Sequence, residues 1–297
     1  MKWLAIVNPF SGGKKRESEL RRVLSSLEKL TSKYMITKYQ GHAEELAREA
    51  SDFDGLAVVG GDGTLHEVLQ GMNCYEQLLA VIPAGTGNSL ARDLGLNSMM
   101  AGIQSVESRN LVRIDLMRVS FQDKNGLRRE YVSASTIAIG YPTTVLKAAN
   151  QRLKSLRKSC YPVAAAFKTL FQKHFHVQLR YNHSHLESKS LTGLLINNTR
   201  HVANFLAFPN ASFEDGFMDV MELNAGCLKQ TIHNLSVLSQ RYFYMPAPVR
   251  GAASLLVEMA VPQDLVIDGE IYPEVTNLQI HMLPHKLRCY RRGKSHP

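Results

Sequence analysis

The stretch Leu56-Ala57-Val58-Val59-Gly60-Gly61-Asp62-Gly63-Thr64 decides the fold that this sequence predicts. Its apolar half predicts a short buried strand, and its glycines predict a sharp turn at the end of that strand. Backbone N–H groups in such a turn can converge on an anion because no Cβ stands in the way. We expect a helix to begin at or just after Thr64, so that its N-terminal dipole points into the same space.

The aspartate in the middle of this turn, Asp62, restricts the kind of anion that the turn can hold. A carboxylate repels phosphate unless a cation lies between them, and Mg²⁺ prefers oxygen ligands. The turn therefore indicates a nucleotide triphosphate handled together with Mg²⁺. Gly-Gly-Asp-Gly is also an ordinary turn with a turn-forming aspartate, so the rest of the chain must decide between the two interpretations.

The first 120 residues alternate predicted strands and helices, which is typical of a parallel sheet with crossover helices. Three loops, at 8–13, 60–64 and 83–88, each follow a predicted strand. Ligands in such folds bind beyond the carboxyl ends of the strands, so we expect the three loops to line one crevice. The predicted elements are strands at 3–7, 34–37, 56–59 and 78–82, and helices at 20–30, 42–50, 64–71 and from Ser89.

The pattern changes near Val119, and the rest of the chain predicts a mostly antiparallel, β-rich domain with one or two inserted helices. We expect an α/β fold of two domains: an N-terminal α/β nucleotide-binding domain at 1–120 and a β-rich domain at 121–284. The tail at 285–297 packs back on the first domain in this interpretation, and the active site lies in the cleft between the two domains. The predicted β-elements are a hairpin turn at 123–126 and strands at 131–138, 177–181, 191–196, 218–223, 255–259, 265–267, 278–282 and 287–290.

Bulk composition restricts the class of protein. The chain of 297 residues is 44% hydrophobic and 21% charged, and no apolar stretch approaches the roughly 20 residues of a membrane span. Its apolar start ends at Asn8-Pro9 without a cleavage-type segment, so we expect a cytoplasmic protein. A net charge of +9 favours nucleotides, nucleic acids or acidic lipids as partners. Four widely spaced cysteines argue against a zinc site or a disulfide framework.

A basic stretch lies in the second half of the chain, where residues 131–186 contain no Asp or Glu. Apolar residues interleave with its cations, which predicts a basic amphipathic helix that meets anionic lipid headgroups. A solvated helix face over a core stripe would give the same pattern. The cations are Lys147, Arg152, Lys154, Arg157, Lys158, Lys168 and Lys173.

Four motifs occur in order along the chain: Val7-Asn8-Pro9 with Ser11-Gly12-Gly13, then 60–64, then Pro83-Ala84-Gly85-Thr86-Gly87-Asn88-Ser89-Leu90-Ala91-Arg92, and finally Asp268-Gly269-Glu270. Together they resemble the diacylglycerol kinase catalytic domain, in the superfamily of soluble bacterial lipid kinases and sphingosine kinases. The resemblance implies a fold like those of NAD kinase and diacylglycerol kinase. It also implies an ATP-dependent lipid kinase, most simply one that converts diacylglycerol to phosphatidic acid with ATP and Mg²⁺ as cofactors.

The resemblance also has implications for partners. It implies a lipid substrate at an anionic membrane surface, reached by peripheral association without a membrane span. No nucleic acid is expected, because no recognised motif supports one. A homodimer remains open.

The resemblance assigns nucleotide contacts to the loops. The first loop approaches the nucleotide, the two glycine turns cradle its phosphates, and a threonine at the end of the second strand contacts ATP. That threonine, Thr37, could equally be a β-branched strand residue, and Asn88 is predicted to cap the helix that follows it. The implied nucleotide-binding residues are Asn8, Ser11, Thr37, Gly60, Gly61, Asp62, Gly63, Thr64, Gly85 and Thr86.

Three carboxylates are expected to perform the chemistry. Glu270, presented where a strand ends, is the candidate general base that accepts the proton of the lipid hydroxyl as the phosphoryl group moves. Asp115 lies in an apolar strand, where an unpaired carboxylate is costly, so it needs a partner or faces the crevice. The resemblance places Asp62 and Asp115 in one metal and catalytic network with Glu270, whereas Asp268 is predicted to be a turn former.

The segment Ser212-Phe213-Glu214-Asp215-Gly216-Phe217 resembles one that holds a second, structural Mg²⁺ in bacterial lipid kinases. The resemblance implies the Asp215 carboxylate and the backbone carbonyls of Ser212 and Phe217 as ligands. Asp-Gly is also an ordinary turn, so the segment has a purely structural interpretation as well.

Several functions stay open beside a diacylglycerol kinase. Bacterial diacylglycerol kinases usually carry asparagine at the position of His66, so a sphingosine kinase or another lipid kinase is an alternative. An NAD kinase shares the first glycine turn, although the second turn and the late Asp-Gly-Glu fit it poorly. A non-catalytic nucleotide-binding regulatory module is a further alternative.

Overall fold

The computed structural model describes residues 1–12, 23, 25–27, 31–144, 173–202, 205–224 and 249–293. The chain divides into two compact units. The first comprises Met1–Leu116, Phe213–Gly216 and Leu283–Pro297, and the second comprises Met117–Ser212 and Phe217–Met282. The inclusion of 213–216 in the first unit has no counterpart in the sequence prediction, which set boundaries near residues 120 and 284.

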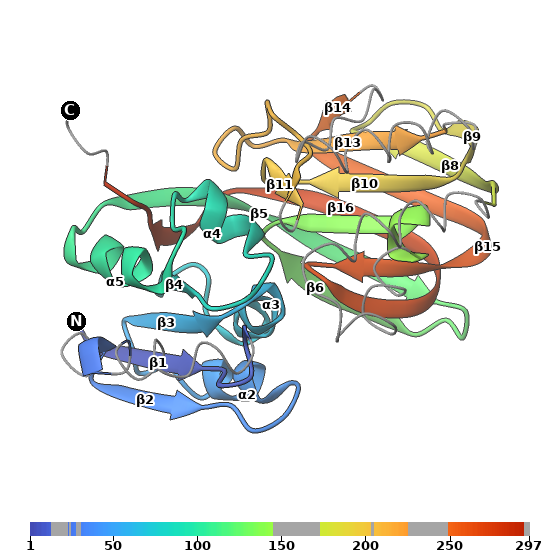
Figure 1. Cartoon of the computed structure of the whole chain (residues 1–297). Coiled ribbons are helices and arrows are strands. Elements are labelled where there is room, and N and C mark those ends of the chain that lie inside the picture. Colours follow the sequence, from blue (N-terminus) through green and yellow to red (C-terminus); the bar gives the residue numbers. More distant parts are fainter. Residues whose placement is uncertain are drawn as a thin grey trace. The chain divides into compact units, whose positions relative to one another are not determined.

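The first unit contains, in chain order, β1 (Trp3–Val7), β2 (Lys33–Ile36), α2 (His42–Arg48), β3 (Gly55–Gly60), α3 (Asp62–Gly71), β4 (Leu78–Pro83), α4 (Ser89–Asp93) and α5 (Met99–Glu107). Its strands are parallel in the order β2-β1-β3-β4, with the end of β16 (Glu270–Tyr290) added beside β4 (Figure 1). Every residue of β1, β3 and β4 is buried, as expected for parallel strands covered on both faces. The predicted α/β architecture is therefore confirmed for this unit.

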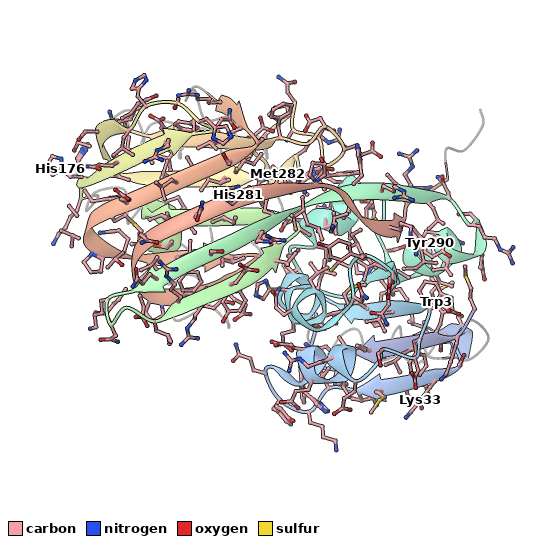
Figure 2. All side chains as sticks on the ribbon, turned by 180° about the vertical axis from the view of Figure 1, so that it is seen from behind. Trp3, Lys33, His176, His281, Met282 and Tyr290 are labelled. Atoms are coloured by element: carbon pink, nitrogen blue, oxygen red, sulfur yellow. The ribbon has the colours of Figure 1, made fainter. Side chains whose placement is uncertain are left out.

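Tight contacts join the layers of the first unit. The rings of Trp3 and Tyr290 lie 5.8 Å apart, and Figure 2 labels both. A Cβ on Gly102 would come within 2.7 Å of the Val81 carbonyl oxygen, so α5 can lie against β4 only because this residue is glycine. Val23 and Leu27 are buried in the same core, and most of the predicted helix at 20–30 lies outside the described residues.

The second unit is built from antiparallel pairs among its described strands, which confirms a mostly antiparallel β-rich region. The basic helix expected within it, with cations from Lys147 to Lys173, lies outside the described residues apart from Lys173. The strands of the unit are the end of β5 (Leu111–Asp123), β6 (Arg128–Ser133), β7 (Thr136–Gly140), β8 (Phe175–Tyr181), β9 (Glu187–Leu191), β10 (Gly193–Asn197), β11 (His201–Val202), β12 (Phe205–Leu206), β13 (Met218–Leu223), β14 (Val249–Ala252), β15 (Ser254–Ile267) and most of β16.

One strand of the second unit, β15, pairs with different neighbours along its length. Its residues 255–259 pair with β8, and its residues 265–267 pair with β7, whose other neighbour is β10. The pairing register of β15 with β16 shifts between Glu258 and Leu265. A bulge in a strand increases its bend and twist, so one strand can pair with β8 along one part and with β7 along another. The two strands expected at 255–259 and 265–267 are therefore one strand.

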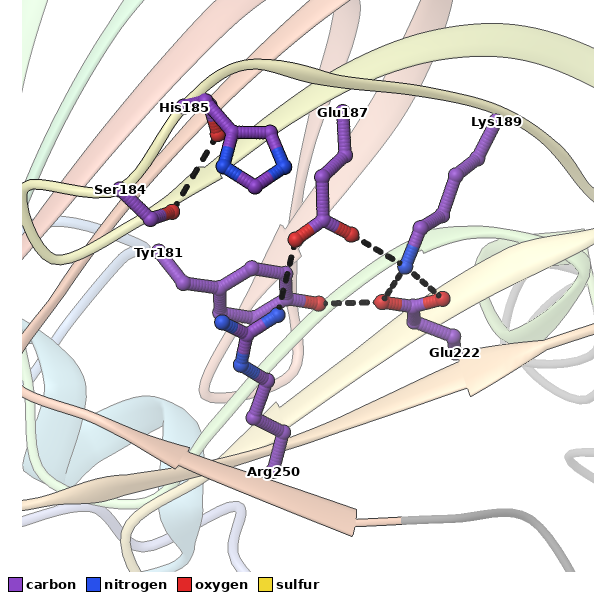
Figure 3. Close-up of polar contacts among 7 residues, drawn as sticks. All are labelled: Tyr181, Ser184, His185, Glu187, Lys189, Glu222 and Arg250. Carbon is purple, nitrogen blue, oxygen red and sulfur yellow. Dashed lines mark hydrogen bonds and ion pairs between the residues drawn. The ribbon is translucent and has the colours of Figure 1, made fainter.

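Ion pairs and a buried tyrosine connect β8 and β9 to β13 and β14 (Figure 3). The Tyr181 hydroxyl donates to Glu222 over 2.7 Å, and the Lys189 ammonium lies 2.7 Å from the same carboxylate. Arg250 pairs with Glu187 at 3.1 Å, and its guanidinium lies 4.0 Å from the centre of the Tyr181 ring. We refer to these five residues as the ion-pair network.

The single strand expected at 131–138 is interrupted. β6 ends at Ser133 and β7 begins at Thr136. Between them, the backbone N–H groups of Ala134 and Ser135 donate to the Asp268 carboxylate instead of a neighbouring strand, which explains the break. The hairpin predicted at 123–126 is confirmed, with Gly126 at φ 81° in the turn between β5 and β6. Among the described residues, no helix has the length and hydropathy to cross a membrane.

Candidate functional site

Two glycine turns of the first unit lie against each other at the carboxyl ends of β3 and β4. A Cβ on Gly61 would come within 3.1 Å of the Gly85 Cα, and one on Gly85 within 2.5 Å of the Gly61 Cα. The Ala84 N–H donates to the Gly60 carbonyl over 2.8 Å. This approach excludes a side chain at Gly85, leaves little room for one at Gly61, and presents a surface of backbone groups, which suits an anion.

The helix after the first turn begins earlier than expected. α3 starts at Asp62, with the extended Gly61 as its N-cap, rather than at or after Thr64. Gly60 must be glycine for this geometry, because a Cβ there would lie 2.5 Å from the Thr64 Cβ. The first turn of α3 is therefore formed by the Asp-Gly-Thr sequence itself, directly beside the glycine contact.

The first loop joins the glycine turns. Asn8 donates its side-chain amide to the Thr64 hydroxyl over 2.8 Å, and its backbone N–H donates to Val59 over 2.9 Å. The loops after β1, β3 and β4 thus meet at one edge of the parallel sheet, as the strand order requires. Within this edge Thr64 is buried and Thr86 is exposed, while Asn8, Ser11 and Gly63 are half-buried.

Asp62 holds the start of the helix after the second turn. Its two carboxylate oxygens accept the backbone N–H groups of Asn88 and Ser89, each over 2.7 Å. Asn88 occupies the N-cap position of this helix, as predicted, but its side chain makes no capping hydrogen bond. Asn88 adopts φ 55°, and its side chain bonds the N–H and the carbonyl of Gly85 instead. The cap therefore comes from Asp62, on a different loop.

Two further residues stabilise this edge. Thr37 is buried, and its N–H donates to the Val7 carbonyl over 2.9 Å, so its backbone continues the sheet. Arg92 donates its Nε–H to the Gly87 carbonyl over 2.9 Å and fixes the end of the second glycine turn. Sequence reasoning missed this role of Arg92, although the residue belongs to the quoted motif.

Asp115 has the partners that a buried carboxylate needs. It is 0% exposed, and it accepts the backbone N–H groups of Gly216 over 2.7 Å and His285 over 2.6 Å. Its own N–H donates to the Phe213 carbonyl over 2.7 Å. These bonds fix the short segment that carries Asp215, whose side chain is exposed on the turn. Asp115 therefore fixes the backbone of this segment, and its own side chain is not exposed to solvent.

The described residues hold no group of three or more His, Cys, Asp and Glu side chains that could bind a metal ion by themselves. A cation at Asp62 or Asp215 would therefore complete its shell with phosphate, backbone or water oxygens. Mg²⁺ is commonly bound in this way, through one or two carboxylates plus substrate phosphates. The donors at both places are oxygens, so their chemistry fits this ion.

Glu270 follows a tight turn of the second unit. Ile267 and Glu270 face each other as the last pair of β15 and β16. The two residues between them have positive φ, 49° for Asp268 and 99° for Gly269, as a two-residue hairpin of the Asp-Gly type requires. A Cβ on Gly269 would meet nothing within 4 Å, so glycine is needed here for its backbone conformation and not for space.

Aromatic side chains lie beside Glu270 on its own strand. Tyr272 is two residues further along β16, so it shares a face with Glu270. Its ring centre lies 4.7 Å from that of Tyr131 and 5.2 Å from that of Phe121. Burial raises the pKa of Tyr272, and Tyr131 and the charges of Glu270 and Asp268 raise it further. The phenol therefore stays protonated beside the carboxylates and can act as a hydrogen-bond donor.

The first unit is thus an α/β domain whose two glycine turns pack together at the carboxyl ends of its parallel strands. Residues 2–119 match the family model of the diacylglycerol kinase catalytic domain. A diacylglycerol kinase of Staphylococcus saprophyticus is 27% identical over 276 residues, which span 89% of this chain and 87% of the relative. Sphingosine kinase 1 of Rattus norvegicus is 34% identical over 122 residues, which span 37% of this chain and 31% of the relative.

The fold has a counterpart among solved structures. The crystal structure of a diacylglycerol kinase from Bacillus anthracis matches with a TM-score of 0.76 and 22% identity over 98% of this chain and 96% of that chain. The resemblance expected from the motifs is confirmed: residues 2–119 match the model of the diacylglycerol kinase catalytic domain, and relatives along the chain are named diacylglycerol kinases. The chain is thereby grouped with lipid kinases of the diacylglycerol kinase and sphingosine kinase type, a family that implies the use of ATP.

Proposed function

We propose that this chain transfers the γ-phosphoryl group of ATP to the hydroxyl of diacylglycerol and forms phosphatidic acid. The observation that supports this most is the contact of Gly61 with Gly85 beside the start of α3. Such an edge offers backbone donors and a helix N-terminus to the phosphates of a nucleotide. The relative that spans most of the chain is named a diacylglycerol kinase, which favours this acceptor.

Each step has a proposed residue. Asn8, Thr64 and Thr86 orient the nucleotide, and Mg²⁺ held at Asp62 neutralises the phosphate charge when bound. Glu270 accepts the proton of the acceptor hydroxyl while that oxygen bonds to the γ-phosphorus and the bond to ADP breaks. Asp115 acts through the segment that it fixes, and Asp215 with the carbonyls of Ser212 and Phe217 is the proposed second Mg²⁺ site.

A sphingosine kinase is the second candidate, because the sphingosine kinase match has the higher identity over its shorter span. The sequence signal for it, His66, is 3% exposed on α3, so this side chain packs inside the first unit rather than facing an acceptor. His66 therefore gives little reason to prefer sphingosine over diacylglycerol.

Radiolabelled ATP with a panel of acceptors tests the proposal. We expect label in phosphatidic acid when diacylglycerol is supplied, and much less transfer to sphingosine, ceramide or NAD. The Glu270→Gln variant should lose turnover by about 100-fold or more while it still binds ATP, because it removes the proton acceptor alone. Preferred transfer to another acceptor would overturn the substrate assignment, and wild-type turnover in Glu270→Gln would remove its role as base.

A further inference from the structure

The residue two positions before Glu270 is the most heavily hydrogen-bonded carboxylate among the contacts of the second unit. Asp268 is 6% exposed, and its Oδ1 accepts the Ser133 hydroxyl over 2.8 Å and the Ser135 hydroxyl over 2.7 Å. The same oxygen accepts the backbone N–H groups of Ser135 and Thr136, each over 3.0 Å. Oδ2 accepts the Ala134 N–H over 3.3 Å. A turn former needs none of these long-range bonds.

A second layer of buried polar groups supports this contact. The Thr136 hydroxyl donates to the Asn197 side chain over 2.5 Å, and the Asn198 N–H donates to the Ser135 carbonyl over 2.8 Å. Asn197 and Asn198 are 0% and 1% exposed. The ends of β6, β7, β10 and β15 thus meet in one polar cluster, which we call the polar platform. Its members are Ser133, Ser135, Thr136, Asn197, Asn198 and Asp268.

The polar platform is joined to Glu270 by a short and rigid path. The β7–β15 ladder runs to the pair of Ile137 with Ile267, and the Asp268 N–H then donates to the Thr136 carbonyl over 2.8 Å. Only Gly269 separates Asp268 from Glu270. Both turn residues have positive φ. A small change in the backbone angles of Asp268 would therefore change the direction of the start of β16 and the position of the Glu270 side chain.

We propose that Asp268 is a positioning residue that aims the Glu270 carboxylate by anchoring the Asp268–Gly269 turn to the polar platform. This inference rests on the proposed function for its kinetic consequence. A general base acts only within hydrogen-bond reach of its proton, and a displacement of about 1 Å can cost on the order of 100-fold in rate. The Asp268 carboxylate accepts hydrogen bonds from several donors whose positions the fold fixes. Because hydrogen bonds to a charged acceptor are stronger than those to a neutral one, a carboxylate holds the turn more firmly than a neutral side chain would.

Two substitutions at this position separate the side chain from the backbone. Asp268→Gly keeps the positive φ accessible and removes every acceptor atom. Asp268→Asn also tolerates positive φ and retains one carbonyl oxygen for the Oδ1 contacts. We expect kcat to fall by about 100-fold in Asp268→Gly and by only about 3- to 10-fold in Asp268→Asn, with KM for ATP unchanged in both.

The decisive measurement is a double-mutant comparison. Asp268→Gly introduced into the Glu270→Gln variant should cause no further loss of kcat. If Asp268 acts only by positioning the Glu270 carboxylate, its removal has no effect once that carboxylate is gone. A further loss of tenfold or more would show an independent role and overturn the proposal, as would wild-type kcat in Asp268→Gly alone. Asp123→Gly is the matched control: its Oδ1 accepts the N–H groups of Asn125 and Leu127 in another turn of the same unit. It should keep full turnover.

Hydrogen–deuterium exchange distinguishes this inference from the proposed function. Asp268→Gly should speed exchange of the backbone amides at 268–272 by at least tenfold, and Asp123→Gly should leave them unchanged. If the wild-type chain phosphorylates no lipid, the proposed function fails and the exchange result still decides whether Asp268 anchors the turn. Unchanged exchange at 268–272 would overturn the anchoring whatever the substrate.

Discussion

Gly61 and Gly85 belong to turns after different strands, yet they lie so close that a Cβ on Gly85 would come within 2.5 Å of the Gly61 Cα. The atom that it would meet belongs to the backbone, so no side-chain rotation can relieve the clash. The two turns keep this close contact only while position 85 remains glycine.

Gly85→Ala is therefore expected to weaken ATP binding by about tenfold or more, because relieving such a clash typically costs about 1–3 kcal/mol. Isothermal titration calorimetry with ATP measures the loss. Gly293→Ala is the matched control, since a Cβ there would meet nothing within 4 Å. Unchanged ATP affinity in Gly85→Ala would exclude the paired turns from the nucleotide site.

The Asp62 carboxylate can be either a helix cap or a magnesium ligand, and the two roles have different signatures. Asp62→Asn keeps an oxygen that can accept from Ser89 but removes the negative charge. If Asp62 holds Mg²⁺, the variant should lose most of the gain in ATP affinity that Mg²⁺ brings, while binding of ATP in EDTA should be equal or tighter. Calorimetry with and without Mg²⁺ tests this, with Asp123→Asn as control. An unchanged Mg²⁺ effect would leave Asp62 as a cap alone.

The ion-pair network should contribute to the stability of the second unit. Glu222→Ala leaves the buried Tyr181 hydroxyl without this acceptor, so we expect a loss of about 1–3 kcal/mol in the free energy of unfolding. The loss should be smaller when Tyr181→Phe is present as well, because both partners are then removed. Chemical denaturation measures both, and Glu44→Ala, which breaks an exposed pair on α2, should cost under about 0.5 kcal/mol. Equal losses in the two Glu222→Ala backgrounds would contradict the coupling.

The same network predicts a dependence of stability on pH. Hydrogen bonds from Lys189 and Arg250 lower the pKa of Glu187. A group whose pKa is lower in the folded chain stabilises the fold above its unfolded pKa of about 4.5, and this contribution is lost as the pH falls through the folded value. The melting temperature should therefore fall more steeply below about pH 4.5 in the wild type than in Glu187→Gln. Parallel curves would contradict this.

Membrane association is expected to depend on the basic stretch, which lies outside the described residues apart from Lys173. Changing Lys154, Arg157 and Lys158 to glutamate should reduce sedimentation with phosphatidylserine vesicles, and added salt should weaken wild-type binding. Lys33, Lys38 and Arg128 are exposed on the described surface, and their change to glutamate alters the net charge equally. That control should bind more strongly than the first variant; equal binding would show that only net charge matters.

Local patterns in the sequence predicted much of the fold. The alternation of apolar runs and glycine turns located β1, β3 and β4, and the Asp-Gly pair located the turn before Glu270. These features depend on side chains a few residues apart, so the sequence contains them directly. Residues 255–267 were predicted less well, because whether a bulge breaks a strand depends on its neighbours.

What the sequence by itself determined is the order of strands, turns and helices in the first unit and the identity of the residues at its glycine turns. Only the tertiary structure decided what the buried carboxylates do. Asp115 binds a backbone group 170 residues away, and Asp268 binds a hydroxyl 135 residues away. The sequence shows only that a residue is Asp or Glu, and not whether its carboxylate faces solvent, a metal ion or a backbone N–H. Its role follows from the donors that folding brings to it, and those donors carry no local signal.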